Sequence, residues 1–140
     1  MDDWRHLIVD TDFAIEILSV NMDAIDYVMQ ANSSLYISVV SKAELIRGAQ
    51  NKTHLNRILK EIDLFTVIDL DSEVSTTFNK LMQQYTLSHR IGISDAFIAA
   101  TSLTYDLPLL TCNTRHFTYI SGIKLPHHGV KPQRRGFLGF

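Results

Sequence analysis

The chain has 140 residues, of which 46% are hydrophobic, and it carries a formal net charge of −2 with a pI of about 6.3. This length and hydrophobic content predict one compact domain with a sizeable core, and the charge excludes an overall basic field for nucleic acid. Cys112 is the only cysteine, which excludes an internal disulfide and fits a reducing cytosol. Neither a signal peptide nor a membrane-length apolar run is visible, so we expect a cytoplasmic protein without membrane contact.

The first apolar run, Leu-Ile-Val at residues 7–9, predicts a strand that is buried on both faces in the middle of a parallel sheet. The run ends in Asp10-Thr11-Asp12, and a helical pattern begins at Phe13. Open α/β sheets place their chemistry at the carboxyl ends of central strands. Asp10 and Asp12 are therefore candidate functional acids, with capping of the following helix as the structural alternative.

Further along the chain, helical and strand patterns alternate. Strands are predicted at residues 35–40, 65–68, 108–112 and, at the sheet edge, 123–125. Helices are predicted from residue 13 to a break at Asn21, from there to about residue 30, and from residues 41, 53, 72 and 93 onward. This alternation predicts parallel βαβ units and a three-layer α/β/α domain with the first strand central.

Two interpretations are open for Glu44. The sequence Ser41-Lys42-Ala43-Glu44 has the spacing of a helix capping box, in which the glutamate side chain reaches back to the amide of the cap residue. In a parallel sheet, however, the carboxyl ends of strands and the amino ends of crossover helices share one edge. The residues that this topology brings to the same edge are Asp10, Asp12, Glu44, Asp95 and Asn113.

Carboxylates gathered at one edge repel each other and raise one another's pKa, so such a cluster calls for a cation. Oxygen ligands alone indicate Mg²⁺ or Mn²⁺, and Mg²⁺ binds phosphate readily, which indicates hydrolysis of a phosphodiester. The alternative is a coincidence of helix-start acids, each of which is a common stabilising feature of a first helical turn.

Four motifs together resemble the PIN domain, and more narrowly the VapC-type toxins of bacterial and archaeal toxin–antitoxin pairs. They are Asp10-Thr11 after an apolar strand, Ser41-x-x-Glu44-Leu45-x-x-Gly48, Asp95-Ala96-x-Ile98-Ala99-Ala100-Thr101 and Leu110-x-x-Asn113-x-x-x-Phe117. The resemblance implies a metal-dependent endoribonuclease that cleaves single-stranded RNA, is usually dimeric, and is held inactive by a cognate antitoxin protein. By position, Asp10, Glu44 and Asp95 match the catalytic, metal-binding acids of the family.

The chain departs from the family pattern near these acids. Asp12 stands where the family commonly has Asn or Ser, the fourth acidic position is Asn113, and His116 replaces the Asp often found before the Phe. Without a fourth acid, the affinity for a second metal ion is in question, and Asp12 is the residue that could compensate. His116 is a candidate proton donor to the leaving oxygen, with a solvated loop histidine as the alternative.

Supporting roles follow from the same resemblance. Thr11 or Ser94 would hydrogen-bond a carboxylate and orient it, and Thr111 would contact a phosphate or a metal-bound water. Plain packing or helix capping is the alternative for each.

The resemblance covers roughly residues 7–125, so we expect a PIN domain at residues 1–125 and a loosely ordered tail at residues 126–140. Charge and stacking in this tail offer a second way of holding RNA. The side chains concerned are Lys131, Arg134, Arg135, Phe137 and Phe140.

Other functions stay open on the residues alone. Asp10-x-Asp12 also resembles the nucleophile motif of haloacid-dehalogenase-type phosphatases, although Ala14 stands where that family has Thr or Val. A response-regulator receiver shares the fold class, but Ser41 and Asn113 stand at the comparable strand ends in place of the Asp and Lys that it needs. A degenerate PIN domain, which binds RNA or a protein partner without cleavage, is the third alternative.

Overall fold

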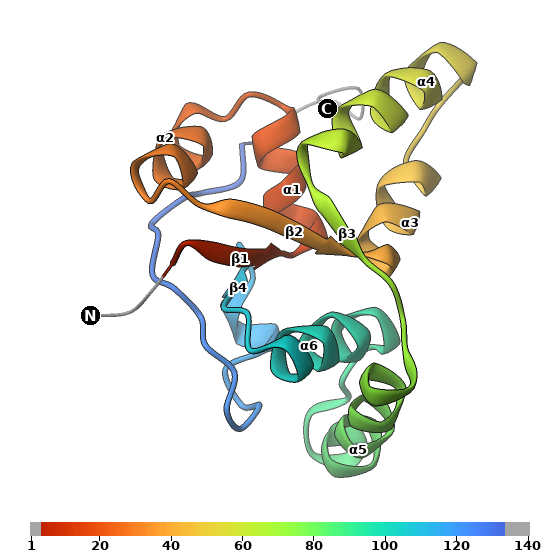
Figure 1. Cartoon of the computed structure of the whole chain (residues 1–140). Helices are drawn as coiled ribbons and strands as arrows, with labels where there is room; N and C mark the ends of the chain where they lie inside the picture. Colours follow the sequence, from red (N-terminus) through yellow and green to blue (C-terminus); the bar gives the residue numbers. More distant parts are fainter. Residues whose placement is uncertain (1–3, 134–140) are drawn as a thin grey trace.

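The computed structural model describes residues 4–133. Its strands pair in parallel in the order β3-β2-β1-β4, which confirms that the first strand is central, between the second and the fourth (Figure 1). The strands are β1 (His6–Val9), β2 (Ser34–Ser38), β3 (Thr66–Ile68) and β4 (Leu109–Leu110).

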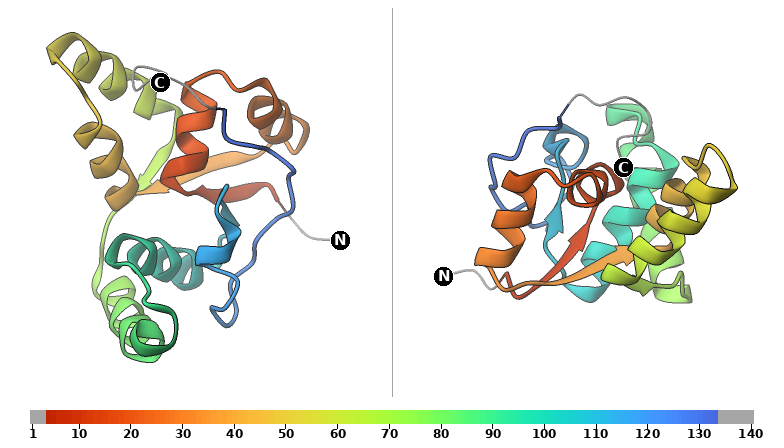
Figure 2. Two further views of the ribbon diagram at one scale, coloured as in Figure 1. Left: turned by 180° about the vertical axis from the view of Figure 1, so that it is seen from behind. Right: turned by 90° about the horizontal axis from the view of Figure 1, so that it is seen from above.

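Helices cover both faces of the sheet and give the predicted three layers. Leu7 and Val9 of β1 belong to the core cluster under α1 and α2, whereas Ile8 belongs to the cluster under α5 and α6. This alternation is what a strand imposes on successive side chains, and Figure 2 shows the two helical layers on opposite sides of the sheet. The helices are α1 (Thr11–Leu18), α2 (Met22–Gln30), α3 (Val39–Arg47), α4 (Lys52–Glu61), α5 (Ser72–His89) and α6 (Ile93–Tyr105), with short 3₁₀ turns η1 (Ile62–Leu64) and η2 (Thr114–His116). Within residues 4–133, none of these helices combines the length and hydropathy needed to cross a membrane.

Several helices begin at a polar residue whose side chain accepts a hydrogen bond from a backbone amide in the first turn of the helix. Asn21 accepts from the amide of Asp23 at the start of α2, and Asp71 accepts from the amide of Val74 at the start of α5. Each bond satisfies a donor that the helix itself leaves without a partner. Both caps lie directly before helices that the sequence predicts.

The predicted capping box at Ser41 is wrong. β2 runs directly into α3, and Ser38 is the cap, since its hydroxyl accepts from the amide of Val40. Ser41 therefore lies inside the helix and is fully buried. Val39 and Val40, which the sequence assigns to the strand, form the first helical turn, because the serine before them ends the extended backbone.

The predicted edge strand at residues 123–125 is also absent from the described part of the chain, where the sheet has four strands. This segment gives β4 one backbone hydrogen bond, from the amide of Leu109 to the carbonyl of Lys124. A single bond does not extend into a ladder, so the segment remains irregular.

Residues 126–133 contain no helix or strand and run back to α1 and α2 (Figure 1). Val130 is buried, and Asn21 donates to the carbonyl of Lys131. The buried Glu16 accepts hydrogen bonds from the Asn21 side chain and from the amide of Gln133, both at 2.9 Å. Of the predicted tail residues, Arg134, Arg135, Phe137 and Phe140 lie outside the described residues.

Candidate active site

Asp10 sits at the carboxyl end of the central strand and is only 7% exposed. One oxygen, Oδ1, accepts from the amide of Thr11 at 2.8 Å and so caps α1. The other, Oδ2, accepts from the hydroxyl of Thr111 at 2.8 Å. Because Val9 and Leu110 are partners in the parallel register, the residues that follow them leave the sheet side by side. Asp10 thus both caps a helix and faces the neighbouring strand end.

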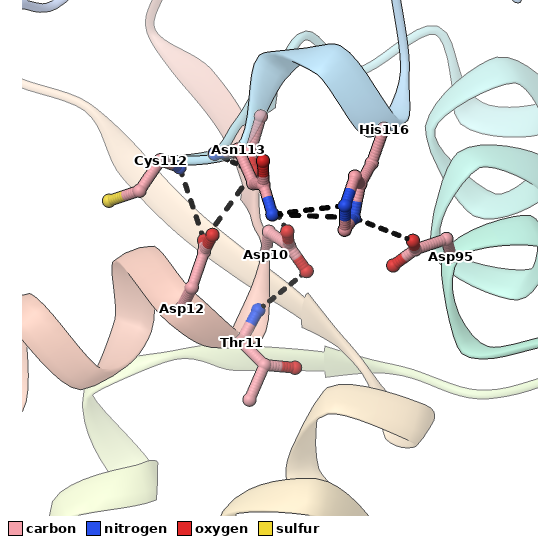
Figure 3. Close-up of polar contacts among 8 residues, drawn as sticks. Asp10, Thr11, Asp12, Asp95, Cys112, Asn113 and His116 are labelled. Atoms are coloured by element: carbon pink, nitrogen blue, oxygen red, sulfur yellow. Dashed lines mark hydrogen bonds and ion pairs between the residues drawn. The ribbon is translucent and has the colours of Figure 1, made fainter. Parts of the chain in front are cut away.

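Asp12 lies in the first turn of α1 and reaches the same strand end. Its Oδ1 accepts from the amide of Cys112 at 3.2 Å and lies 3.4 Å from the hydroxyl of Thr111 (Figure 3). The carboxylate therefore fixes the turn after β4 against α1. Burial raises the pKa of the Cys112 thiol to about 12, so this side chain stays protonated and unreactive at neutral pH.

Glu44 approaches from α3 and is exposed to solvent. Its Oε1 accepts a 2.7 Å hydrogen bond from the hydroxyl of Thr11, the first residue of α1. Thr11 therefore contacts two acids at once, Asp10 through its amide and Glu44 through its hydroxyl. This gives the threonine the orienting contact that the sequence proposes for it.

Asp95 lies in the first turn of α6, on the other side of Asp10. Its Oδ2 is 3.1 Å from Nδ1 of His116, which belongs to η2. The Asn113 side-chain nitrogen lies 3.2 Å from Nε2 of the same ring, so the histidine stands between the amide and the carboxylate (Figure 3). Ser94 precedes Asp95, but its hydroxyl makes no hydrogen bond within residues 4–133.

Burial is the largest cause that raises the pKa of Asp10, Asp12 and Asp95, and neighbouring carboxylates add to it at Asp10 and Asp95. Burial, followed by the charges of Asp12 and Asp95, raises the pKa of Asp10 to about 7 against two opposing hydrogen bonds. Burial also raises the pKa of Asp12. For Asp95, burial and the charges of Glu44 and Asp12 raise the pKa, while His116 opposes them. Without a cation, the ionised cluster is therefore costly.

The chemistry of these donors fits a hard divalent cation such as Mg²⁺ or Mn²⁺. They offer carboxylate oxygens only, and a positive ion between them would relieve the repulsion that raises their pKa values. In the arrangement shown, no three His, Cys, Asp or Glu side chains among residues 4–133 converge closely enough to hold an ion. Each of the acids is instead engaged by a neighbour, including Glu44 by Thr11 and Asp95 by His116.

Two contacts of Thr111 are not predicted from the sequence. It proposes a phosphate or a metal-bound water as the partner of this hydroxyl, whereas the structure shows the hydroxyl donating to Asp10. The backbone carbonyl of Thr111 lies 2.6 Å from Nε2 of His128, which ties the segment after residue 126 to the site. The parallel pairing of the first and fourth strands is the signal that predicts the first contact, because it makes positions 10 and 111 neighbours.

Similarity to known proteins agrees with this geometry. A ribonuclease VapC1 from Rickettsia felis is 30% identical over 98 residues, which cover 64% of this chain and 73% of the relative. A ribonuclease VapC1 from Methanocaldococcus jannaschii is 32% identical over 96 residues, covering 64% and 68%.

Solved structures share the fold at lower identity. The VapBC-1 structure from nontypeable Haemophilus influenzae aligns with a TM-score of 0.76 at 23% identity, over 86% of this chain and 96% of that chain. A toxin–antitoxin complex from Klebsiella pneumoniae aligns with a TM-score of 0.72 at 24% identity, over 87% and 98%. The PIN domain family matches residues 7–122. The chain therefore belongs to the PIN domain family and, within it, to the group of the VapC proteins.

Proposed function

We propose that the chain is a metal-dependent endoribonuclease that hydrolyses single-stranded RNA and acts as the toxin of a toxin–antitoxin pair. The observation that carries the proposal is the convergence of Asp10, Asp12 and Asp95 at the carboxyl edge of the sheet, where burial and, for Asp10 and Asp95, neighbouring charges raise the pKa of the carboxyl groups. A fold keeps such a costly arrangement where a function uses it. The relatives named ribonuclease VapC support the reaction, and the structural neighbours named as toxin–antitoxin complexes support the partner.

Asp10, Glu44 and Asp95 would hold the Mg²⁺ or Mn²⁺ ion. When bound, such an ion activates water and neutralises the charge that develops on the phosphate. Thr111 and Asp12 hold Asp10 and the turn after β4 in place, and Thr11 holds Glu44.

The loop after β4 completes the proposed site. Asn113 lies beside His116 and would offer the cluster an oxygen without charge. His116 is the candidate donor of a proton to the leaving 3′ oxygen, because it contacts Asp95 and is half-exposed at the same edge. Ser94, at the start of α6, is available to a phosphate oxygen. Residues 1–125 would form the catalytic domain.

Two partners follow for the whole protein. A cognate antitoxin would bind it and hold it inactive, and a second copy would form a homodimer. Both would act in the cytoplasm. Expression with the neighbouring reading frame tests the antitoxin, since a small protein with a DNA-binding motif should co-purify with this chain and abolish cleavage.

The activity is tested with purified chain and a single-stranded RNA. Cleavage should require Mg²⁺ or Mn²⁺, stop with EDTA, and leave a 5′-phosphate and a 3′-hydroxyl, because water and not the ribose hydroxyl attacks. Asp95→Asn should abolish it, while Asp26→Asn, on the exposed surface of α2, is the matched control and should cleave like the parent. A 2′,3′-cyclic phosphate product contradicts the hydrolytic mechanism. A folded parent that binds RNA without cutting it indicates the degenerate PIN domain.

A further inference from the structure

A pocket of about 360 Å³ opens beside the acid cluster, between the end of α5, the start of α6 and η2. This volume is within the range of small-ligand pockets, about 300–1,000 Å³. Asp95 lines it, so the pocket is continuous with the carboxylates of the proposed active site. Its lining residues include His89, Arg90, Gly92, Asp95, Arg115 and Tyr119, as well as His116.

Two cations in this pocket have no anionic partner within residues 4–133. Arg90 and Arg115 are both exposed, and neither guanidinium forms an ion pair there. Arg90 ends α5 in the left-handed conformation, with φ of 51° and ψ of 43°, and its position is fixed by a bond from its amide to the carbonyl of Thr86. In a chain with a net charge of −2, two free guanidiniums next to a carboxylate cluster make a local anion site.

The pocket also has an aromatic wall that is braced from behind. The ring of His89 stacks on Tyr119 with centroids 4.0 Å apart and planes 10° apart. Tyr119 in turn meets the buried Tyr85 edge-on at 5.0 Å, and the Tyr85 hydroxyl accepts from the amide of Ser121. His89 is the exposed end of this column. A planar ligand that stacks on His89 would extend this column of packed rings.

The start of α6 adds donors at the same place. Gly92 caps this helix without a side-chain acceptor, and Asp95 in its first turn also lines the pocket. The first amides of a helix favour a phosphate group, so this terminus adds to the attraction of the arginines.

We propose that this pocket binds one nucleotide unit of single-stranded RNA next to the bond that is cut. Its phosphate lies between Arg90 and Arg115, and its base stacks on His89. The proposal rests on the proposed function, since it assigns a substrate subsite to the same edge of the sheet. A cationic pair with a stacking platform is what binding to single strands requires, whereas a lone anion would leave the aromatic wall without a role.

Binding to a labelled single-stranded RNA in EDTA tests the subsite without any cleavage. The affinity should fall with salt, and Arg90→Gln or Arg115→Gln should each reduce the slope of log K against log salt by about 0.7, the change for one phosphate contact on a single strand. Arg90→Lys should keep the parent slope. The matched control is Lys80→Gln, which removes an exposed cation of α5 about 15 Å along the helix from Arg90 and should change nothing.

Stacking is tested separately. His89→Ala should weaken RNA binding about tenfold, while His89→Phe should keep it, because a base needs only an aromatic face. The same oligonucleotide without bases should bind parent and His89→Ala equally. His127→Ala, which removes an exposed histidine outside the pocket, is the control.

The outcomes separate the subsite from the nuclease proposal. Metal-dependent cleavage together with parent-like binding by the Arg90, Arg115 and His89 variants overturns the subsite and leaves the nuclease intact. Loss of binding in these variants, in a protein that never cleaves, supports the subsite and overturns the nuclease. Failure of the parent to bind any RNA at low salt overturns the subsite, as does equal binding of the abasic strand and the intact strand by the parent. Circular dichroism of each variant shows that its fold is retained.

Discussion

The acid cluster has two halves that are held very differently. Asp10 and Asp12 are fixed, since the amides of Thr11 and Cys112 and the buried hydroxyl of Thr111 all donate to them. Glu44 and Asp95 are held by one side-chain contact each, from Thr11 and His116, with Glu44 exposed and Asp95 half-buried. We call these the fixed half and the adjustable half.

This difference indicates which carboxylates would have to move when a metal ion binds. The fixed half is positioned by the fold itself, because its partners belong to the strand pair β1–β4 and to the start of α1. The adjustable half has to give up its present contacts before its oxygens can converge on an ion. Assembly of the site should therefore be coupled to metal binding in the adjustable half and be independent of it in the fixed half.

The largest expected effect is the loss of cleavage when a proposed ligand from either half loses its charge. Asp10→Asn and Asp95→Asn should each lower the rate by at least about a thousandfold, corresponding to about 4 kcal/mol of transition-state stabilisation. Both should relieve growth arrest on expression in cells. Asn is as good a helix cap as Asp, so Asp10→Asn should keep α1 intact, which circular dichroism can check. Retained cleavage in Asp10→Asn would remove the fixed half from the chemistry.

The second effect is a pH dependence of stability in metal-free buffer. The pKa of Asp10 is raised from 3.8 to about 7, so the folded state holds its proton more tightly than the unfolded state. Between these two values the free energy of unfolding falls as the pH rises, by at most about 4 kcal/mol. Thermal unfolding in EDTA should therefore give a Tm at least about 5 °C lower at pH 8 than at pH 5.

Asp10→Asn isolates this contribution. The variant should melt higher than the parent at pH 8, where the parent carboxylate is ionised, and by a smaller margin at pH 5, where the folded parent holds its proton. Mg²⁺ should raise the Tm of the parent at pH 8 far more than that of the variant. A parent whose Tm rises steadily from pH 5 to pH 8 in EDTA would contradict the raised pKa.

The third effect concerns the adjustable half and an added charge. Sequence alone favours Asn113 as the missing fourth acid, but the structure places His116 on Asp95, with Asn113 behind it. His116→Asp should therefore tighten Mg²⁺ binding about tenfold, the equivalent of about 1.4 kcal/mol, and Asn113→Asp should do less. Calorimetric titration of both variants ranks them. The opposite order would mean that Asn113 turns inward when the metal binds.

The smallest expected effects come from replacing Thr111 or Thr11, the two threonines that contact the fixed and the adjustable half. Thr111→Val removes a buried donor to a carboxylate and should destabilise the metal-free protein by about 1.5–3 kcal/mol. Thr11→Val removes only a donor to the exposed Glu44, so it should leave the Tm within about 1 °C and raise the Mg²⁺ needed for half-maximal cleavage about twofold. Equal effects of the two changes would erase the distinction between fixed and adjustable acids.

The sequence predicts the framework of the fold because local chemistry decides it. The apolar run at residues 7–9 has to be buried on both faces, and Asp71 caps a helix wherever an amphipathic pattern follows it. The start of α3 could not be predicted in the same way. Ser38 and Ser41 are both acceptable caps, and the structure uses Ser38 and buries Ser41 inside the helix.

The candidate site also contains contacts that the sequence predicts and contacts that it does not. Topology alone brings Asp10, Glu44 and Asp95 to one edge, since strand ends and helix starts meet there. The contact of His116 with Asp95 depends on how the loop after β4 turns into η2, and neither propensity nor hydrophobic pattern specifies that turn. The hydroxyl of Thr111 falls between these cases, because register predicts its place and only the side-chain geometry shows its partner.

The order in which the chain is made gives the contact between Asp10 and Thr111 a further meaning. Their 101-residue separation means that the first acid leaves the ribosome long before the threonine that holds it. At about 5–20 residues per second, the delay is about 5–20 s. For most of that time Asp95 and His116 are also missing, so the nascent chain carries Asp10, Asp12 and Glu44 without Asp95. Until synthesis has passed the fourth strand, the emerging polypeptide therefore lacks the residues that complete the candidate site.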